Sequence, residues 1–154
     1  MSHSRELPAM PVTFRPVRTR MVLLTVGSLL VATFTAVAFT MPDPHWTATD
    51  RTFMITVGVL MFALLALLSR PKAIATRAGL TVINLTTKRC LEWPQVLGVN
   101  LRAGDPWVYL DLADGTSLAV MGIQPGAGKA RAIRDAGSLR ALAEAYGTSP
   151  SAGG

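Results

Sequence analysis

Few side chains in this sequence are of the types that carry out chemistry. The two histidines are His3, near the N-terminus, and His45, in a polar loop between two apolar stretches; the single cysteine, Cys90, lies in the second half. A nucleophile needs a base within hydrogen-bond reach, and a structural zinc site needs several cysteine or histidine ligands. Because neither histidine falls in the segment that carries Cys90, we predict no catalytic residue, no metal ligand and no cofactor.

The acidic side chains of the second half are scattered rather than paired. They are Glu92, Asp105, Asp111, Asp114 and Asp135. Most stand in predicted turns or at the ends of predicted strands, where an acid commonly serves as a solvated turn former. We therefore predict that the protein is not an enzyme. An unrecognised hydrolase or transferase is the alternative, and a buried carboxylate cluster in the folded chain would favour it.

The segment GIQPGAGKA, residues 122–130, resembles a phosphate-binding loop but has the wrong spacing. A P-loop has four residues between its first glycine and the Gly-Lys pair, followed by Ser or Thr to meet magnesium. Here five residues separate Gly122 from Gly128, and Ala130 follows Lys129. The pattern predicts a flexible connection between a strand and a helix.

Two small groups of residues are candidates for contact with other molecules. Lys88 and Arg89 stand in a predicted hairpin turn, with Arg77 close by, and offer an anion contact, although such a turn is often only solvated. Trp93 and Trp107 are candidates for a partner surface, although tryptophan in a small β domain more often lies in the core. Both interpretations stay open for each group.

The composition points to a membrane. The chain of 154 residues is 50% hydrophobic and has a mean hydropathy of +0.38. Two uncharged stretches, residues 21–41 and about 52–69, each have the roughly 17 to 25 residues needed to cross the hydrocarbon layer as a helix. The remaining chain is too short to bury two such helices. We predict a transmembrane hairpin over residues 21–69.

The net charge of +6 follows the membrane segments rather than a nucleic-acid surface. Most of the surplus lies in residues 1–72, and basic residues cluster before the first span and after the second, at 15–20 and 70–77. The positive-inside rule therefore places both termini in the cytoplasm and the connecting loop outside. The excess of Arg over Lys, with abundant Ala and Gly, indicates a bacterium, so we predict a multi-pass protein of the inner (plasma) membrane that binds no nucleic acid.

A second topology treats residues 1–38 as a secretory signal. Ala36-Val37-Ala38 follows an apolar core and resembles a cleavage site. The second apolar stretch would then stop transfer, so the C-terminal domain would stay in the cytoplasm under either history.

The C-terminal half has the pattern of a β-sheet followed by one helix. Short segments rich in Val, Leu, Ile and Thr alternate with turn residues, and Asp114-Gly115 is the strongest hairpin signal. We predict six antiparallel strands, at residues 73–77, 80–85, 90–93, 96–102, 107–112 and 117–123. A helix is predicted after them, with an apolar stripe of Ile133, Ala136, Leu139, Leu142, Ala143 and Tyr146 and a potential kink at Gly137-Ser138.

These patterns divide the chain into four parts. They are a basic cytoplasmic N-terminal segment at residues 1–20, the two-helix hairpin at 21–69, a cytoplasmic domain at 73–148 and a flexible tail at 149–154.

A sheet that needs covering, followed by an amphipathic helix, has the outline of the pleckstrin-homology (PH) architecture. The stretch RAGLTVINLTTKRCLEWPQVLGVNL, residues 77–101, leads from a Gly-Leu-Thr hairpin to a Trp. It resembles small actinobacterial membrane proteins that have two transmembrane helices and a bacterial PH-like domain, the group that includes a low-molecular-weight culture-filtrate antigen. The resemblance covers residues 73–147 and implies an α+β domain, a small antiparallel β-barrel or roll with one C-terminal helix.

We therefore expect a non-enzymatic membrane protein whose PH-like module binds protein partners, as an accessory subunit of a membrane complex. We identify no small-molecule substrate. The alternative is a module that senses anionic lipid through Arg77, Lys88 and Arg89, because PH-like domains often use basic hairpin loops at a membrane surface.

Overall fold

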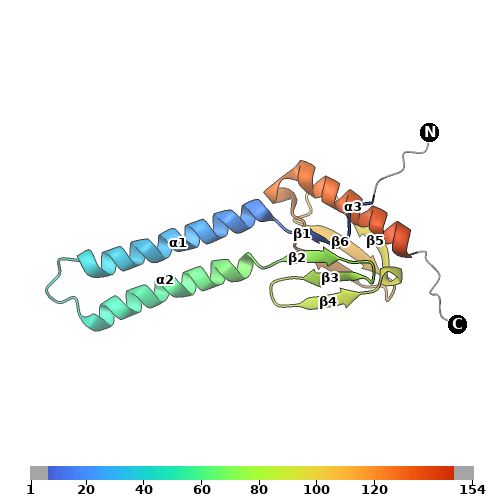
Figure 1. Cartoon of the computed structure of the whole chain (residues 1–154). Coiled ribbons are helices and arrows are strands. Elements are labelled where there is room, and N and C mark those ends of the chain that lie inside the picture. The colour runs from blue at the N-terminus through green and yellow to red at the C-terminus, as the bar shows by residue number, and fades with distance from the viewer. Residues whose placement is uncertain (1–6, 148–154) are drawn as a thin grey trace. The chain divides into compact units, whose positions relative to one another are not determined.

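A computed structural model of the chain describes residues 7–147, and these form two compact units. One unit is a helical hairpin of residues 17–70. The other is a domain that combines residues 71–147 with residues 7–16, from the opposite side of the hairpin in the sequence (Figure 1). The predicted tail at 149–154, like His3, lies outside the described residues.

The hairpin consists of α1 (Val17–Thr40) and α2 (Ala48–Leu68), which lie side by side (Figure 1). Both helices are long and apolar enough to cross a membrane. Many of their large apolar side chains are exposed, including Met21, Leu29, Phe53 and Leu60. A helix that is apolar on nearly every face is typical of a membrane span.

Glycines let the two helices approach closely. Gly27 of α1 lies against the ring of Phe62, and Gly58 of α2 lies against Phe34. A Cβ atom built on Gly27 would stand 2.8 Å from Cδ2 of Phe62, and one built on Gly58 would stand 3.1 Å from Cβ of Phe34. Each helix therefore receives a phenylalanine of the other in a space that a glycine leaves.

The loop of the hairpin is held by hydrogen bonds at the helix ends. Thr47 caps α2 in a capping box: its backbone N–H donates to the Asp50 carboxylate over 2.9 Å, and the Asp50 N–H donates to the Thr47 hydroxyl over 3.3 Å. Nε1 of Trp46 donates to the carbonyl oxygen of Ala38 over 2.9 Å. These bonds satisfy backbone groups that a helix end leaves free.

Within residues 7–147, the domain has two antiparallel sheets and a C-terminal helix. One sheet has the order β1 (Val12–Phe14), β2 (Lys72–Ala75), β3 (Leu80–Ile83), β4 (Lys88–Leu91). The other has the order β5 (Val96–Asn100), β6 (Val108–Leu112), β7 (Ser117–Val120). Short 3-10 turns at Trp93–Gln95 and Pro125–Ala127 lead into β5 and into helix α3 (Lys129–Gly147).

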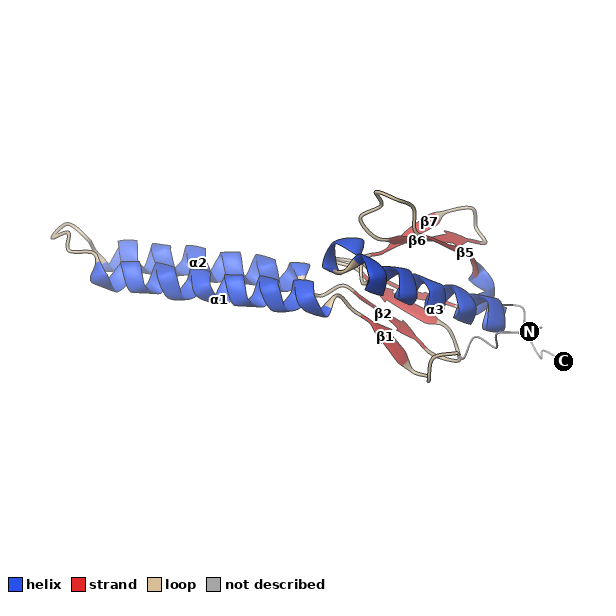
Figure 2. Ribbon diagram, turned by 90° about the horizontal axis from the view of Figure 1, so that it is seen from above, coloured by secondary structure: helices blue, strands red, loops and turns tan. Residues whose placement is uncertain are grey.

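The predicted fold class is confirmed: a helical hairpin is followed by an α+β domain of the PH-like type. The sheets are not closed into a barrel, so the domain is an open roll. Figure 1 shows α3 on top of the strands, and Figure 2, seen from above, shows it crossing over them, with β5, β6 and β7 to one side of it and β1 and β2 to the other. One helix therefore covers the apolar faces that both sheets present.

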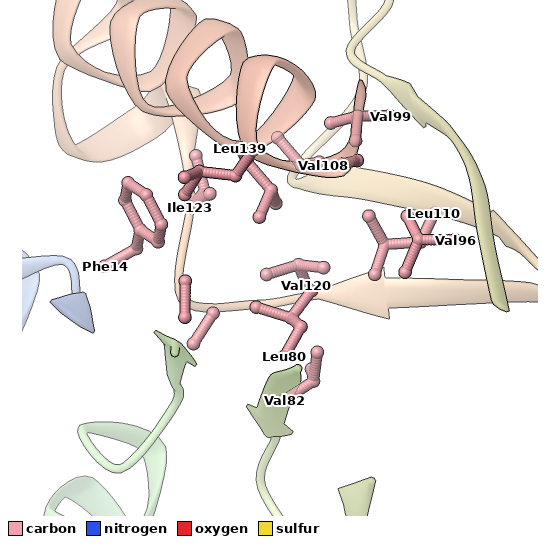
Figure 3. Close-up of a cluster of buried hydrophobic side chains, with 14 of the residues drawn as sticks. Phe14, Leu80, Val82, Val96, Val99, Val108, Leu110, Val120, Ile123 and Leu139 are labelled. Carbon is pink, nitrogen blue, oxygen red and sulfur yellow. The ribbon is translucent and has the colours of Figure 1, made fainter. Parts of the chain in front are cut away.

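The core draws on every layer of the domain. Figure 3 shows Leu80 and Val82 of β3 facing Val120 of β7, with Leu139 of α3 on the opposite side of the cluster. Phe14 of β1 belongs to the same cluster and is 4% exposed. Burial of large aliphatic and aromatic side chains at this density is the main stabilising contribution to such a domain.

The strand β1 is the element that the sequence reasoning missed. It pairs antiparallel with β2, so that Val12 faces Ala75 and Phe14 faces Ala73. A strand of three residues gives almost no periodicity, and its partner strand lies beyond both helices in the sequence. The N-terminal segment is therefore part of the domain's sheet and not only a basic flank to the first helix.

A buried side chain joins the two sheets where no strand pairing does. Asn84, which follows β3, is 9% exposed. Its Nδ2 donates to the carbonyl oxygen of Ala119 over 2.9 Å, and the Met121 N–H donates to its Oδ1 over 3.2 Å. The Asn84 amide thus bonds to the backbone of the β7 region much as a neighbouring strand would.

Helix α3 differs from the expected pattern in two ways. It is continuous through Gly137 and Ser138, so the anticipated kink is absent from the described helix. Its buried side chains are Ala132, Ala136, Leu139, Leu142 and Ala143. Ile133, predicted for the packing stripe, is 55% exposed instead, because Ala132 takes the core-facing position in that turn.

Candidate functional site

The three basic candidates do not form one cluster. Arg77 lies in the turn between β2 and β3, at the Leu80 end of β3. Lys88 pairs with Ile83 at the other end of that strand. Four residues of strand separate these ends, which corresponds to roughly 10 Å. The structure thus places Arg77 and Lys88 at opposite ends of strand β3.

Lys88 and Arg89 also point to opposite faces of the sheet. Both belong to strand β4 rather than to the predicted turn, which the structure places at residues 84–87. Successive side chains on a strand alternate in direction. Arg89 pairs with the buried Val82, so it lies on the core-side face at the edge of the sheet, whereas Lys88 lies on the outer face. A charge at an edge in this position discourages pairing with another chain.

Arg89 has an electrostatic neighbour in the turn between β6 and β7. Its charge contributes to lowering the pKa of Asp114. The larger cause of the lowered pKa is Thr116, whose hydroxyl and backbone N–H donate to the Asp114 carboxylate over 2.6 and 2.9 Å. Asp114 thus serves as a turn-forming acid in the manner expected from the Asp-Gly signal.

The two tryptophan candidates lie in different surroundings. Trp93 is 2% exposed; its Nε1 donates to the carbonyl oxygen of Thr76 over 2.8 Å, and its ring stacks on Tyr146 with centroids 6.0 Å apart. It is a core residue that ties the β2–β3 turn to α3. Trp107, just before β6, is half-buried, and within residues 7–147 its buried Nε1 has no hydrogen-bond partner.

The acids of the domain make separate local contacts. Asp111 on β6 accepts hydrogen bonds from Nδ2 of Asn100 and from the Ser117 hydroxyl, on the outer face of the three strands β5, β6 and β7. Asp105 accepts from the backbone N–H of Arg102 over 2.9 Å. Among residues 7–147 there is no group of three or more His, Cys, Asp or Glu side chains placed to hold a metal ion.

Asp135 of α3 is the acid most affected by burial. Burial raises the pKa of its carboxyl, and the charges of Arg131 and Arg134 oppose the rise. Nε of Arg131 lies 3.7 Å from its carboxylate, one helical turn earlier. A single carboxyl with a neighbouring arginine has the chemistry of a helix-surface ion pair.

The Gly-rich segment before α3 is a connection, as its spacing indicates. Pro125–Ala127 forms a 3-10 turn, and α3 begins at Lys129. Gly128 has φ of +143°, a conformation that other residues rarely adopt, so glycine is needed where the chain turns into the helix.

Two hollows of the domain lie along α3, and the sequence did not indicate them. A hollow of about 410 Å³ runs between β5 and the C-terminal half of α3, and another of about 700 Å³ lies beside Leu101 and Ile133. Both are lined by Arg140. We call the pair the β5–α3 groove.

Two large apolar side chains stand out along this groove. Leu97 is 69% exposed and Ile133 is 55% exposed. Leu97 occupies a β-bulge, because the register between β5 and β6 shifts between Val96 and Gly98. Regular alternation could not have identified Leu97, because it places Leu97 on the same face as the buried Val99; only the bulge lets Val96 and Val99 both be buried while Leu97 is exposed.

Two arginines give the groove a positive charge. Arg134 and Arg140 both line the hollow beside Ile133, and none of its lining residues within the described range 7–147 is acidic. Nη2 of Arg140 donates to the carbonyl oxygen of Val99 over 2.7 Å, so this guanidinium is held at the edge of β5. Glu144 is the acid that lines the hollow between β5 and α3.

Comparison with known proteins supports the architecture and assigns no activity. Residues 70–142 match a family model described as a bacterial PH domain. Uncharacterized proteins of Mycobacterium bovis and Mycobacterium tuberculosis are 34% identical over 97 residues, a match that covers 63% of this chain and 62% of each relative. No solved structure shows significant similarity. The PH-like domain is thus supported, while none of these names refers to a culture-filtrate antigen.

Proposed function

We propose that this chain is a non-enzymatic protein of the bacterial inner membrane that presents its PH-like domain at the cytoplasmic face to bind protein partners. The observation that carries the proposal is that residues from both sides of the helical hairpin build one sheet. Only residues 15–16 and 69–71 connect the helices to that sheet. Connections this short keep the domain within a few residues' reach of the bilayer.

The pairing of β1 with β2 supports a two-span topology. Phe14 and Ala73 are neighbours in the sheet, so the chain must return to the side from which it started. The start of α1 and the end of α2 are joined by this pairing, and both helices are long enough to span a membrane. The chain returns to its starting side if both helices cross the membrane. Cleavage after Ala38 would remove β1 together with Phe14 from the core, which argues for retention of the first helix.

The orientation rests on charge. Arg15, Arg18 and Arg20 adjoin the start of α1, and Arg70 and Lys72 follow α2. The positive-inside rule favours the cytoplasm for these flanks and the outside for the loop. The domain, which contains the flanking strands β1 and β2, then faces the cytoplasm.

Protein binding is favoured over lipid sensing by the placement of the candidate residues. Arg77 is separated from Lys88 by the length of a strand, and Arg89 points to the other face, so the three offer no common anion site. The β5–α3 groove instead combines exposed apolar side chains with arginines, as contact surfaces for proteins do. The lipid alternative therefore lacks a supporting arrangement.

We extend the proposal to an accessory subunit of a membrane complex. The exposed apolar faces of α1 and α2 offer surface for packing against other membrane helices as well as against lipid. The order of hairpin and PH-like domain also supports grouping the chain with the actinobacterial proteins that include the culture-filtrate antigen.

Topology and partnership are tested separately. A fluorescent protein fused after Gly154 should fold in the cytoplasm, and a cysteine in the loop at residues 41–47, in a Cys90→Ser background, should react with a membrane-impermeant reagent on intact cells. Purification of the full chain in mild detergent should recover a partner at constant stoichiometry. Labelling of the C-terminal end only from outside, or repeated isolation of a lone monomer, would contradict the proposal.

A further inference from the structure

We propose that the β5–α3 groove binds an extended segment of a protein partner that carries a carboxylate between apolar side chains and lies along the free edge of β5. The inference rests on the proposed function, since it names the surface and the chemistry of the partner. Binding of such a segment requires three properties of the groove: an accessible strand edge, apolar anchor points and a positive charge at a fixed position.

The strand edge is accessible. β5 is the outer strand of its sheet, so one row of its backbone N–H and C=O groups has no strand partner. All five residues from Val96 to Asn100 line the hollow between β5 and α3. Within residues 7–147, the edge is therefore open to an extended peptide except at the Val99 carbonyl, which Arg140 occupies, and such a peptide can add backbone hydrogen bonds to the sheet.

The apolar anchor points flank the shared arginine. Leu97 belongs to the hollow beside β5, and Ile133 belongs to the hollow beside Leu101, while Arg140 lines both. Within the domain, Leu97 and Ile133 are among the few large apolar side chains that are exposed. Covering two such side chains removes apolar surface from water, which provides affinity without a deep cavity.

The charge selects an acidic segment. Arg134 and Arg140 face the hollow beside Ile133, and among residues 7–147 no acid lines it. The guanidinium of Arg140 is already held by one hydrogen bond to Val99, which leaves other N–H groups to meet a carboxylate. Because Arg140 is fixed before binding, little side-chain freedom is lost when the acid arrives.

The occupant differs in chemistry from a lipid headgroup and from a second copy. An extended peptide uses the edge of β5, which a phosphate does not need. The chain itself is basic, with a net charge of +6, so a second copy offers a poor match to arginines. These two occupants are therefore outcomes that the experiment must separate from the proposed one.

The experiment places a photocrosslinking amino acid in the full chain in its native membrane. It replaces Leu97 or Ile133, both exposed, and Thr86, an exposed residue of the β3–β4 turn, serves as the reference position. Mass spectrometry identifies the crosslinked molecule and the residues that are attached. We expect positions 97 and 133 to capture the same partner, through a segment with Asp or Glu between apolar residues.

Charge variants then test the chemistry on the same crosslink. Arg140→Glu and Arg134→Glu should each reduce crosslinking at position 97 or 133 about tenfold, because an attractive charge-assisted contact becomes repulsive. Arg140→Lys should retain most of it. Lys129→Glu, on an exposed residue of the same helix away from the groove, is the matched control and should have no effect.

Each other result overturns the inference in a recognisable way. A partner captured at position 86 but not at 97 or 133 leaves the proposed function standing and removes this groove from it. Capture of lipid or of a second copy at 97 and 133, or of a segment without acids, contradicts the proposed occupant. The absence of any crosslinked protein at all three positions contradicts both the groove and the proposed function.

Discussion

The helical hairpin and the domain treat large apolar side chains in opposite ways. In the hairpin, residues such as Phe53 and Leu60 are exposed, and a glycine of each helix lies against a phenylalanine of the other. In the domain, residues such as Leu80, Leu110 and Leu139 are fully buried between two sheets and a helix. The hairpin thus leaves apolar side chains exposed in the way that suits an apolar solvent, whereas the domain builds an apolar interior from distant parts of the chain.

The difference predicts where substitutions will be costly. A residue in the domain touches neighbours that cannot move without moving a sheet. Gly27, between the two helices, touches the side chain of Phe62, which can adjust. The four predictions that follow sharpen this comparison, from the largest expected effect to the smallest.

Phe14→Ala should produce the largest loss. Phe14 is 4% exposed in the core cluster although it precedes both helices in the sequence. Removing a buried phenylalanine ring costs about 3–5 kcal/mol of unfolding free energy. Denaturant unfolding of the full chain in detergent micelles, followed by tryptophan fluorescence, measures it. The exposed neighbour Thr13 is the control, and Thr13→Ala should change stability by less than about 0.5 kcal/mol. Equal effects of the two substitutions would show that β1 does not belong to the core.

The same substitution of glycine by alanine should differ between the two regions. A Cβ on Gly122 would stand 2.8 Å from the Lys72 Cα, which is backbone, whereas one on Gly27 meets the end of the Phe62 ring at the same distance. We expect Gly122→Ala to destabilise the domain by about 1–3 kcal/mol. Gly27→Ala should cost less than about 1 kcal/mol, because alanine's higher helix propensity offsets the adjustment of the ring.

Hydrogen exchange at β2 measures the first effect. Distances between spin labels at positions 22 and 68, in a Cys90→Ser background, measure the second. A hairpin that separates with Gly27→Ala while the domain tolerates Gly122→Ala would reverse the comparison.

Asn84→Leu should weaken the joint between the sheets. The substitution leaves the Ala119 carbonyl and the Met121 N–H without their hydrogen bonds to the amide. Unsatisfied buried groups cost about 1–3 kcal/mol. Hydrogen exchange at Met121 should accelerate more than exchange within β3. Asn84→Asp, which keeps the acceptor for Met121 and loses the donor to Ala119, should protect Met121 better than Asn84→Leu does.

The smallest expected effect is on the pH dependence of stability, and two aspartates should act in opposite directions. The pKa of Asp135 is raised by burial, so its contribution to stability is present below its unfolded pKa of about 3.9 and is lost as the pH rises through the folded pKa. The pKa of Asp114 is lowered by its bonds from Thr116, so its contribution is present above about pH 4 and is lost as the pH falls through the folded pKa.

Asp135→Asn should therefore leave stability at pH 7 unchanged or slightly higher, whereas Asp114→Asn should lower it slightly. Unfolding curves of both variants and the parent chain between about pH 3 and 7 test the signs. Loss of stability at pH 7 in Asp135→Asn alone would contradict the assignment of burial as the dominant influence on that carboxyl.

The predictable parts of the fold are those with a local signal. The length of the uncharged stretches predicted the two helices, and alternation with turn residues predicted strands β2 to β7. The stripe on α3 was right for Ala136, Leu139 and Leu142 and wrong for Ile133, since small Ala132 faces the core. A helix of alanines gives a weak indication of which face is buried.

The parts that were missed depend on partners distant in the sequence. Nothing in VTF indicates that β1 pairs across two helices, and nothing near Asn84 indicates that its amide meets β7. The placement of Lys88 and Arg89 on opposite faces required knowing that β4 begins at Lys88, directly after the turn. The exposure of Leu97 could not be predicted either, because it depends on a bulge in the register with β6.

Strand β1 also constrains how the protein is made. During translation it emerges from the ribosome before either helix, and β2 emerges only after both. If both helices cross the membrane as proposed above, β1 cannot pair with β2 until the bilayer has accepted the entire hairpin. If only one helix inserts, the two strands end up in different compartments and Phe14 stays uncovered. On the proposed topology, the sheet is completed only in correctly inserted chains, and we expect a chain that fails to insert to be left unfolded and open to proteolysis.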